Sequence, residues 1–221
     1  MSVTLAERLR SETRAQHVEL ERSALMQQLL RGRMPQPTYC ALLRNLHPIY
    51  QALEAGLAAC ASHPGVAPVC SPALWREPAL RADLDLLHGT DWPRDIAMQS
   101  SAAAYARRLA ALVEGQPERL VGHAYVRYLG DLSGGQVLAR IVSEQLGLRS
   151  GEGVRFYDFG RFDEAAALKQ RFRAGLEAVA ATEADADAVI DEARRAFAMH
   201  AELFDQLHAG ASTRAADGPV S

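Results

Sequence analysis

Three glycines, Gly130, Gly134 and Gly135, fall within six residues in the middle of a stretch whose apolar spacing is otherwise helical. Glycine inside a helix costs about 1 kcal/mol relative to alanine, so such a cluster normally ends a helix. We therefore expect the helix that begins near Pro117 to stop at this cluster, although the apolar period resumes at Val137. Two interpretations are open. Either a loop joins two helices, or one helix bends and brings its backbone close to something flat and bulky, where any Cβ atom would clash.

Helical spacing of apolar residues extends over nearly the whole chain, and no segment shows the alternation typical of a strand. Aromatic residues make up only 6% and alanine is abundant, which favours closely packed helices over sheets. A length of 221 residues favours one domain. We predict an all-α, single-domain bundle over residues 1–209 and a disordered tail over residues 210–221. Helices are expected at residues 5–20, 23–30, 37–57, 77–87, 100–113, 117–129, 137–146, 163–181 and 184–208.

Charge and cysteine content argue against several classes of protein. The net charge of −3 argues against a nucleic-acid-binding protein, which usually carries a basic excess. No apolar run approaches 18 residues, so we expect no membrane span. The three cysteines are scattered without a C-x-x-C pair, and the charged N-terminus lacks the apolar segment of a signal peptide. We therefore expect a cytoplasmic protein.

His17 lies on the apolar face of the first predicted helix. Arg10 precedes it by seven residues, which places both on one face about 10.5 Å apart along the axis. Two side chains at that separation could bind one macrocyclic ligand. The imidazole would bind a metal at its centre, and the cation would bind a carboxylate at its edge. The ordinary interpretation is a structural core histidine. Six further histidines compete for a metal role, and none forms a zinc-binding pattern such as H-E-x-x-H.

Lys169 is the only lysine of the chain, and Arg173 follows it at helical i,i+4 spacing, with Arg171 between them in sequence. Such a group is ordinarily a solvated basic face of a helix. It would also suit a site that clamps carboxylates, so both interpretations stay open.

Several segments resemble the heme oxygenases in sequence, order and spacing. The most specific is Tyr125–Leu138, YVRYLGDLSGGQVL, which contains the glycine cluster and resembles the signature of that family. Thr13–Glu21, TRAQHVELE, resembles the segment that carries the family's proximal histidine. Further matches are His47–Glu54, Phe156–Tyr157, Leu168–Arg173 and the segment from Ala196 to Phe204. The resemblance covers residues 4–208.

This resemblance implies a helical bundle that holds heme between the first helix and a distal helix kinked at the glycines. His17 would ligate the iron from the proximal side. Gly130 and Gly134, with Gly135 beside them, would let the distal backbone lie almost on the heme face.

The resemblance also implies roles for polar residues around the heme. Asp131 would be catalytic and would organise distal water molecules together with Tyr50 and Arg127. The heme propionates would be held by Arg10, Tyr125, Lys169 and Arg173. At the first of these positions the family often has lysine, so arginine is a departure that keeps the charge.

The activity implied by the resemblance is oxidation of heme b, both cofactor and substrate, to biliverdin, carbon monoxide and ferrous iron. The reaction takes dioxygen and electrons from a reductase or ferredoxin, and we expect the α isomer of biliverdin. The chain resembles the bacterial members that lack a membrane anchor. Two alternatives stay open: a heme carrier or storage protein, and a helical-bundle protein that binds no heme.

Overall fold

The computed structural model describes residues 3–149, 151–179 and 183–216, and within these ranges it contains helices and no strand. The predicted all-α class is therefore confirmed. The α-helices are α1 (Leu5–Glu12), α2 (Arg14–Arg22), α3 (Ala24–Leu30), α4 (Gln36–Ala59), α5 (Glu77–Leu87), α6 (Trp92–Asp95), α7 (Ser100–Gly115), α8 (Leu120–Leu146), α9 (Phe162–Val179) and α10 (Glu183–Ala216). Short 3-10 turns lie at Ala67–Val69, Pro72–Leu74, Pro117–Arg119 and Arg155–Tyr157.

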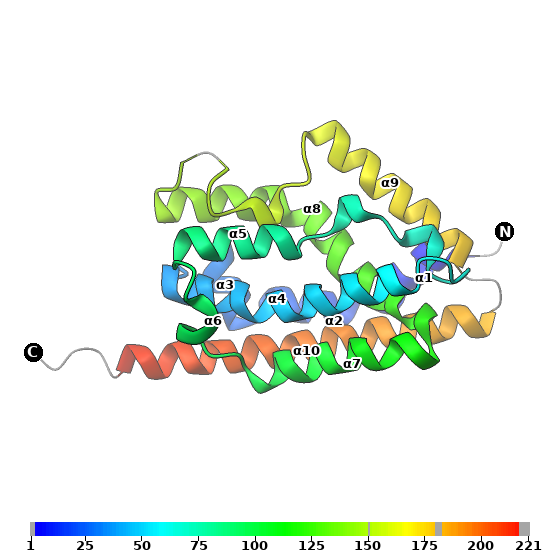
Figure 1. The fold of residues 1–221 in the computed structure, drawn as a ribbon, viewed down its shortest axis with the longest axis horizontal. Helices are drawn as coiled ribbons and strands as arrows, with labels where there is room; N and C mark the ends of the chain where they lie inside the picture. Colours follow the sequence, from blue (N-terminus) through cyan, green and yellow to red (C-terminus); the bar gives the residue numbers. More distant parts are fainter. Residues whose placement is uncertain (1–2, 150, 180–182, 217–221) are drawn as a thin grey trace, which may run out of the picture.

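The long helices α4, α7, α8 and α10 pack on one another and form the frame of the molecule. α4 packs mainly against α7, and α10 packs mainly against α8. α10 extends along the length of the molecule with α7 beside it, and α9 lies on the opposite side (Figure 1). The N-terminal helices α1, α2 and α3 all pack against α10, and α3 also packs against α8.

The crossing of α8 and α10 depends on Gly122. A Cβ atom on Gly122 would lie 2.6 Å from the carbonyl oxygen of Val189 and 2.8 Å from the backbone nitrogen of Ala193. Both distances are shorter than any van der Waals contact of a carbon atom. Glycine therefore allows the two helix backbones to touch at this point.

A buried carboxylate, Glu192 of α10, ties the same helices together. Arg108 donates two hydrogen bonds to it at 2.8 and 2.7 Å, and His123 Nε2 lies 3.1 Å from its Oε1. Burial alone would raise the pKa of Glu192, but the hydrogen bonds from Arg108 and His123 outweigh it and hold the pKa below its ordinary value. His123 Nδ1 lies 3.0 Å from the Tyr105 hydroxyl, so both ring nitrogens of this histidine have protein partners.

The prediction of one continuous helix over residues 5–20 is wrong, because the segment is divided at Thr13. α1 ends before Thr13 and α2 begins after it, and Thr13 itself has φ −110° and ψ 4°. Its hydroxyl donates to the carbonyl oxygen of Leu9 at 2.7 Å, a local bond that often bends helices at threonine. The spacing of Arg10 and His17 along a straight helix therefore does not apply to this chain.

The expected stop at Gly130–Gly135 does not occur, because α8 is a single helix from Leu120 to Leu146. Of the two open interpretations, the structure supports the bending helix, since α8 changes direction near its middle (Figure 1). Asp131, inside the cluster, is buried and pairs with Arg127 one turn earlier. An i,i+4 ion pair favours the helix at this point, and contacts to other helices offset the local cost of the glycines.

The last helix is longer than predicted. α10 continues to Ala216, through the expected boundary at residue 209, so residues 210–216 of the predicted tail are helical. Alanine and arginine are strong helix formers and offset Gly210 in this segment. The rest of the predicted tail, residues 217–221, lies outside the described residues, as do the last two residues of the helix predicted at 163–181.

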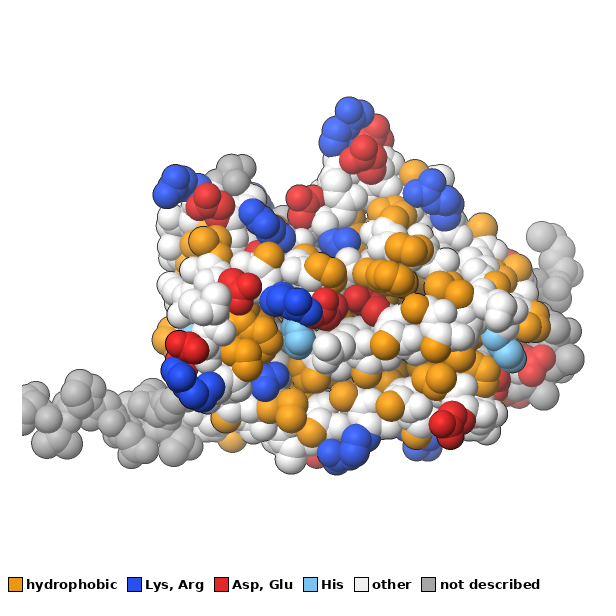
Figure 2. Space-filling view, viewed as in Figure 1, with side chains coloured by type: hydrophobic (Ala, Val, Ile, Leu, Met, Phe, Trp, Pro, Cys, Tyr) orange, Lys and Arg blue, Asp and Glu red, His pale blue; other side chains and the backbone are white. Residues whose placement is uncertain are grey.

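The face of the molecule seen in Figure 2 carries cationic, anionic and apolar side chains interspersed with one another. This distribution agrees with the small net charge of −3. Among the described residues, no helix combines the length and the apolar character that crossing a membrane requires.

We predict that Gly122→Ala destabilises the protein by about 1–3 kcal/mol, because the added methyl group must push α8 and α10 apart. Chemical denaturation would show this as a lower midpoint at an unchanged slope. The matched control is Gly115→Ala, where a Cβ atom meets nothing within 4 Å. That variant should be as stable as the wild type or up to about 1 kcal/mol more stable. Equal free energies of unfolding for Gly122→Ala and Gly115→Ala would contradict the close approach of α8 and α10 at Gly122.

Candidate functional site

A cavity of about 960 Å³ lies between α1 and α2 on one side and the middle of α8 on the other. This volume is near the upper end of the range for small-molecule sites. Its walls are mainly apolar and come from helices far apart in sequence, with Leu20 from α2, Leu46 from α4, Leu129 from α8 and Phe197 from α10. The cavity therefore suits a large, mostly apolar ligand.

His17 lines the α2 wall of this cavity and is half-buried. Its Nδ1 lies 3.7 Å from Oε2 of Glu21, and its ring meets the edge of Phe197 with the centroids 6.0 Å apart. A carboxylate near one ring nitrogen orients a histidine and makes its other nitrogen a better metal ligand. Nε2 of His17 is therefore the nitrogen available to a metal in the cavity.

Gly130 and Gly134 line the opposite wall, on α8. A Cβ atom on either would meet no protein atom within 4 Å, so the packing of the chain alone does not require glycine there. Gly135 differs, because its Cβ atom would lie 3.4 Å from Tyr157 and it does not line the cavity. This corrects the expectation that Gly135 borders the ligand: one residue further along a helix points about 100° away.

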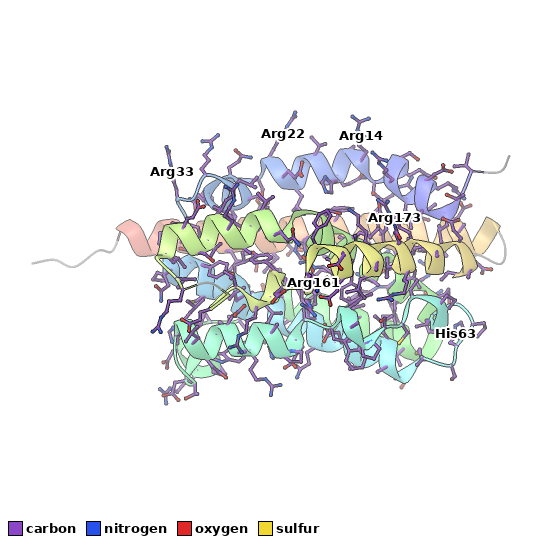
Figure 3. All side chains as sticks on the ribbon, turned by 90° about the horizontal axis from the view of Figure 1, so that it is seen from above. Arg14, Arg22, Arg33, His63, Arg161 and Arg173 are labelled. Atoms are coloured by element: carbon purple, nitrogen blue, oxygen red, sulfur yellow. The ribbon has the colours of Figure 1, made fainter. Side chains whose placement is uncertain are left out.

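Cationic side chains gather at one end of the cavity. Arg10 of α1, Tyr125 of α8 and Arg173 of α9 all line it. Burial raises the pKa of Tyr125, and a hydrogen bond with Thr13 and the charges of Arg10 and Arg173 oppose this rise. Figure 3 shows Arg173 on the side of α9 that faces α1. This end can therefore bind an anionic edge of a ligand.

Lys169 lies one turn before Arg173 on α9 but does not line the cavity. Burial and then the charge of Arg173 lower the pKa of Lys169, so the two side chains are neighbours. Of the two, the structure places only Arg173 in the cavity wall, which corrects the expectation that both hold the ligand directly. Glu7 and Glu177 also line the cavity, so the cations at this end are partly balanced.

A buried polar group stands behind the glycine wall. The Tyr50 hydroxyl of α4 donates to Oδ2 of Asp131 and accepts hydrogen bonds from Nε and Nη2 of Arg127 at 2.8 and 2.7 Å. Arg127 Nη2 also lies 3.4 Å from Oδ1 of Asp131. A guanidinium can only donate, which fixes the Tyr50 proton toward Asp131. The structure thus brings together the three residues that the resemblance grouped.

Burial controls the protonation of this group. It raises the pKa of Asp131 above its ordinary value, against the opposing effects of the Arg127 charge and the Tyr50 hydrogen bond. Burial also raises the pKa of Tyr50 well above its ordinary value, so the phenol keeps its proton. Asp131 lines the cavity and is therefore a carboxyl group suited to hold or pass a proton there.

From sequence alone His200 is only one of the six histidines that compete for a metal role, but the structure places it in the same group as Tyr50, Arg127 and Asp131. His200 is fully buried, lines the cavity, and has its Nε2 2.6 Å from Nη1 of Arg127. Burial, and next the charge of Arg127, lowers the pKa of His200 well below its ordinary value. Its helical spacing from Phe197 and Phe204 was the available sequence signal, because these three residues share one face of α10.

Known proteins match the chain over almost its whole length. The sequence model of the family described as heme oxygenase matches residues 3–206. Heme oxygenase 1 of Synechocystis sp. is 35% identical over 207 residues, which cover 94% of this chain and 86% of that protein. The heme oxygenase of Takifugu rubripes is 36% identical over 204 residues, which cover 92% of this chain and 74% of that protein.

Solved structures agree with the sequence matches. The crystal structure of heme oxygenase-1 from Synechocystis sp. in complex with heme has a TM-score of 0.88 to this chain at 34% identity, covering 94% of each. The heme oxygenase of Leptospira interrogans has a TM-score of 0.88 at 30% identity, covering 92% of this chain and all of that one. By sequence and by fold, the chain belongs to the heme oxygenase family.

Proposed function

We propose that this chain binds heme b between α2 and α8 and cleaves it to the α isomer of biliverdin, carbon monoxide and ferrous iron. The family establishes the enzyme class, and the solved structure of the Synechocystis relative is a complex with heme. The observation that carries the proposal is the pair of facing walls. One presents the His17 imidazole, and the other presents bare backbone at Gly130 and Gly134 beside the carboxyl group of Asp131.

The residues around the cavity fit heme. Among the described residues, no cluster of three or more His, Cys, Asp or Glu side chains could hold a metal ion. A single imidazole on an apolar wall instead suits a metal whose other ligands belong to a bound cofactor, as the porphyrin ring holds the iron of heme. The open space at Gly130 and Gly134 suits a flat ring, and Arg10, Tyr125 and Arg173 suit its two carboxylates.

When bound, heme supplies the iron that activates dioxygen, and its own ring is the substrate. With heme held against this wall, the backbone at Gly130 and Gly134 would restrict where an oxygen molecule could point. Asp131 delivers a proton through a water molecule, because a carboxylate in direct contact would repel dioxygen as it gains negative charge. Tyr50 and Arg127 hold Asp131 in the required orientation.

The reaction also needs partners beyond heme. Dioxygen is the oxidant, and we propose that an electron-donor protein, a reductase or a ferredoxin, supplies the electrons. We also propose a cytoplasmic location, in keeping with the three cysteines, all of which are free.

His17→Ala should leave the fold intact, because the side chain is half-buried and its removal opens no core cavity. Losing a residue that only supports a metal ligand costs about 10–100-fold, so losing the ligand itself should lower turnover at least about 100-fold. Added imidazole should partly restore it. Biliverdin formation, the heme absorption spectrum and circular dichroism measure these effects.

The control is His63→Ala, in a loop away from α2 (Figure 3). Normal turnover with an unchanged heme spectrum in His17→Ala would refute the ligand assignment.

Asp131→Ala should retain heme binding but lower biliverdin formation by about 10²–10⁴-fold, the usual range for losing a general acid. Heme would then be consumed without yielding the pigment. Asp131→Asn serves as a second variant, because its amide oxygen can still accept the Tyr50 hydrogen bond without supplying the acid. Chromatography of the products measures the yield, with exposed Asp205 replaced by Ala as the control. Full biliverdin yield from both Asp131 variants would remove this residue from the mechanism.

Arg173→Ala should release biliverdin isomers other than α, because the cations fix how the nearly symmetric ring is rotated in its plane. A charge-assisted hydrogen bond contributes about 1.5–3 kcal/mol, and about 1.4 kcal/mol already shifts an orientation ratio tenfold. Lys169→Ala is the matched control and should keep the single α isomer, because Lys169 does not line the cavity. If Arg173→Ala combined with Arg10→Ala still gave one unchanged isomer, apolar contacts would set the rotation instead.

A further inference from the structure

His200 contacts a side chain that can only donate hydrogen bonds. Its Nε2 lies 2.6 Å from Nη1 of Arg127, and arginine keeps its charge and has no acceptor atom. Nε2 of His200 must therefore be the acceptor, which places the single ring proton of a neutral imidazole on Nδ1. A proton on Nε2 would bring two donors face to face.

The other ring nitrogen of His200, Nδ1, differs from Nε2 in its surroundings. Among the described residues, no atom makes a hydrogen bond to His200 Nδ1, which is itself buried. The ring packs against Tyr105 and Phe204, with centroids 6.0 and 4.9 Å apart. The titratable or charged groups nearest to it are Arg127, Tyr50 and Asp131 of the polar group, together with His123 and Tyr105. The contact with Arg127 is thus the polar interaction that fixes this ring.

We propose that His200, as the neutral Nδ1–H form, is a positioning residue that holds Arg127 in place and through it orients Tyr50 and Asp131. The consequence for catalysis rests on the proposed heme cleavage, whereas the positioning itself does not. Arg127 donates hydrogen bonds from Nε and Nη2 to the Tyr50 hydroxyl, and Nη2 also faces Asp131. Nη1 is therefore the donor that needs a separate acceptor.

Two changes at His200 would release Arg127. Without an acceptor at this position, Nη1 would stay unpaired in a buried site, and a buried unpaired donor costs free energy. The guanidinium would then turn toward the cavity and give up its hydrogen bonds to Tyr50. Protonation of His200 would have the same effect, since it would place two cations 2.6 Å apart.

The tautomer can be measured in the ligand-free protein. Long-range proton–nitrogen NMR correlations identify which ring nitrogen of His200 carries the proton. We expect an unprotonated Nε2 and a protonated Nδ1 at pH values below and above about 6.5, the ordinary histidine pKa. A proton on Nε2, or an imidazolium ion in this range, would overturn the proposal whatever the protein does with heme.

Two substitutions then test whether His200 holds Arg127. His200→Gln puts an amide oxygen near the position of Nε2, whereas His200→Leu removes the acceptor. In the ligand-free protein, the Arg127 Nε–H signal should be protected from solvent exchange in the wild type and in His200→Gln. In His200→Leu the same proton should exchange about 10-fold faster or more. Equal protection of the Arg127 Nε–H proton in the two variants would overturn the proposal. If His200→Leu fails to fold, the tautomer of His200 in the wild type still tests the proposal.

With hemin bound, His200→Leu should show an unchanged Soret band but about 10-fold less biliverdin per heme consumed, within the range for loss of a supporting residue. His200→Gln should restore most of that yield. The control is His47→Leu, which removes another buried histidine, paired with Glu77 at 2.9 Å and away from the cavity lining. If the wild type itself formed no biliverdin, the proposed function would fail, while the tautomer and Arg127 exchange would still decide the positioning role.

Discussion

Arg127 and Asp131 form an ion pair inside α8, where both residues are less than one-tenth exposed. Removing one partner of such a pair costs about 3–5 kcal/mol, because the remaining charge stays buried. Tyr50 and His200 provide further hydrogen-bonding partners for this pair. The pair lies at the start of the glycine cluster, and it helps α8 remain helical where its sequence alone would end it. The cavity wall depends on that continuity.

The glycines of α8 serve two different purposes. Gly122 and Gly135 lie against neighbouring backbone or side-chain atoms, α10 in the first case and Tyr157 in the second. A Cβ atom on Gly130 or Gly134 would meet no protein atom within 4 Å, and both residues line the cavity. Replacing a helical glycine by alanine at an unhindered position usually stabilises a protein, so these two residues lower the stability of the ligand-free chain. A ligand in the space in front of them would account for this cost.

Much of this arrangement could be predicted from sequence. Apolar periodicity identified most of the helices and their order, though not the break at Thr13 or the continuity of α8, and the segment around Gly130 and Asp131 indicated the family. Residues that one helix face brings together, such as Phe197 and His200, also left a pattern in the sequence.

The remaining details depend on contacts between helices, which local sequence does not encode. The continuity of α8 follows from the burial of Asp131 against Tyr50 of α4. The break at Thr13 is the exception, because the Thr13 hydroxyl bonds locally to the carbonyl oxygen of Leu9 in the preceding turn. Whether Lys169 or Arg173 reaches the cavity depends on how α9 is rotated. The acceptor role of His200 needs the position of Arg127, which lies 73 residues away in sequence.

We propose that Gly130 is present for the ligand and not for the fold. The most direct test is the free energy of unfolding of Gly130→Ala, measured with and without hemin. We predict that the ligand-free variant is more stable than the wild type by about 0.4–1 kcal/mol, because its Cβ atom meets no protein atom. Hemin should then stabilise the variant much less than it stabilises the wild type. A ligand-free variant that is destabilised, or one that hemin stabilises as strongly as the wild type, would contradict the account.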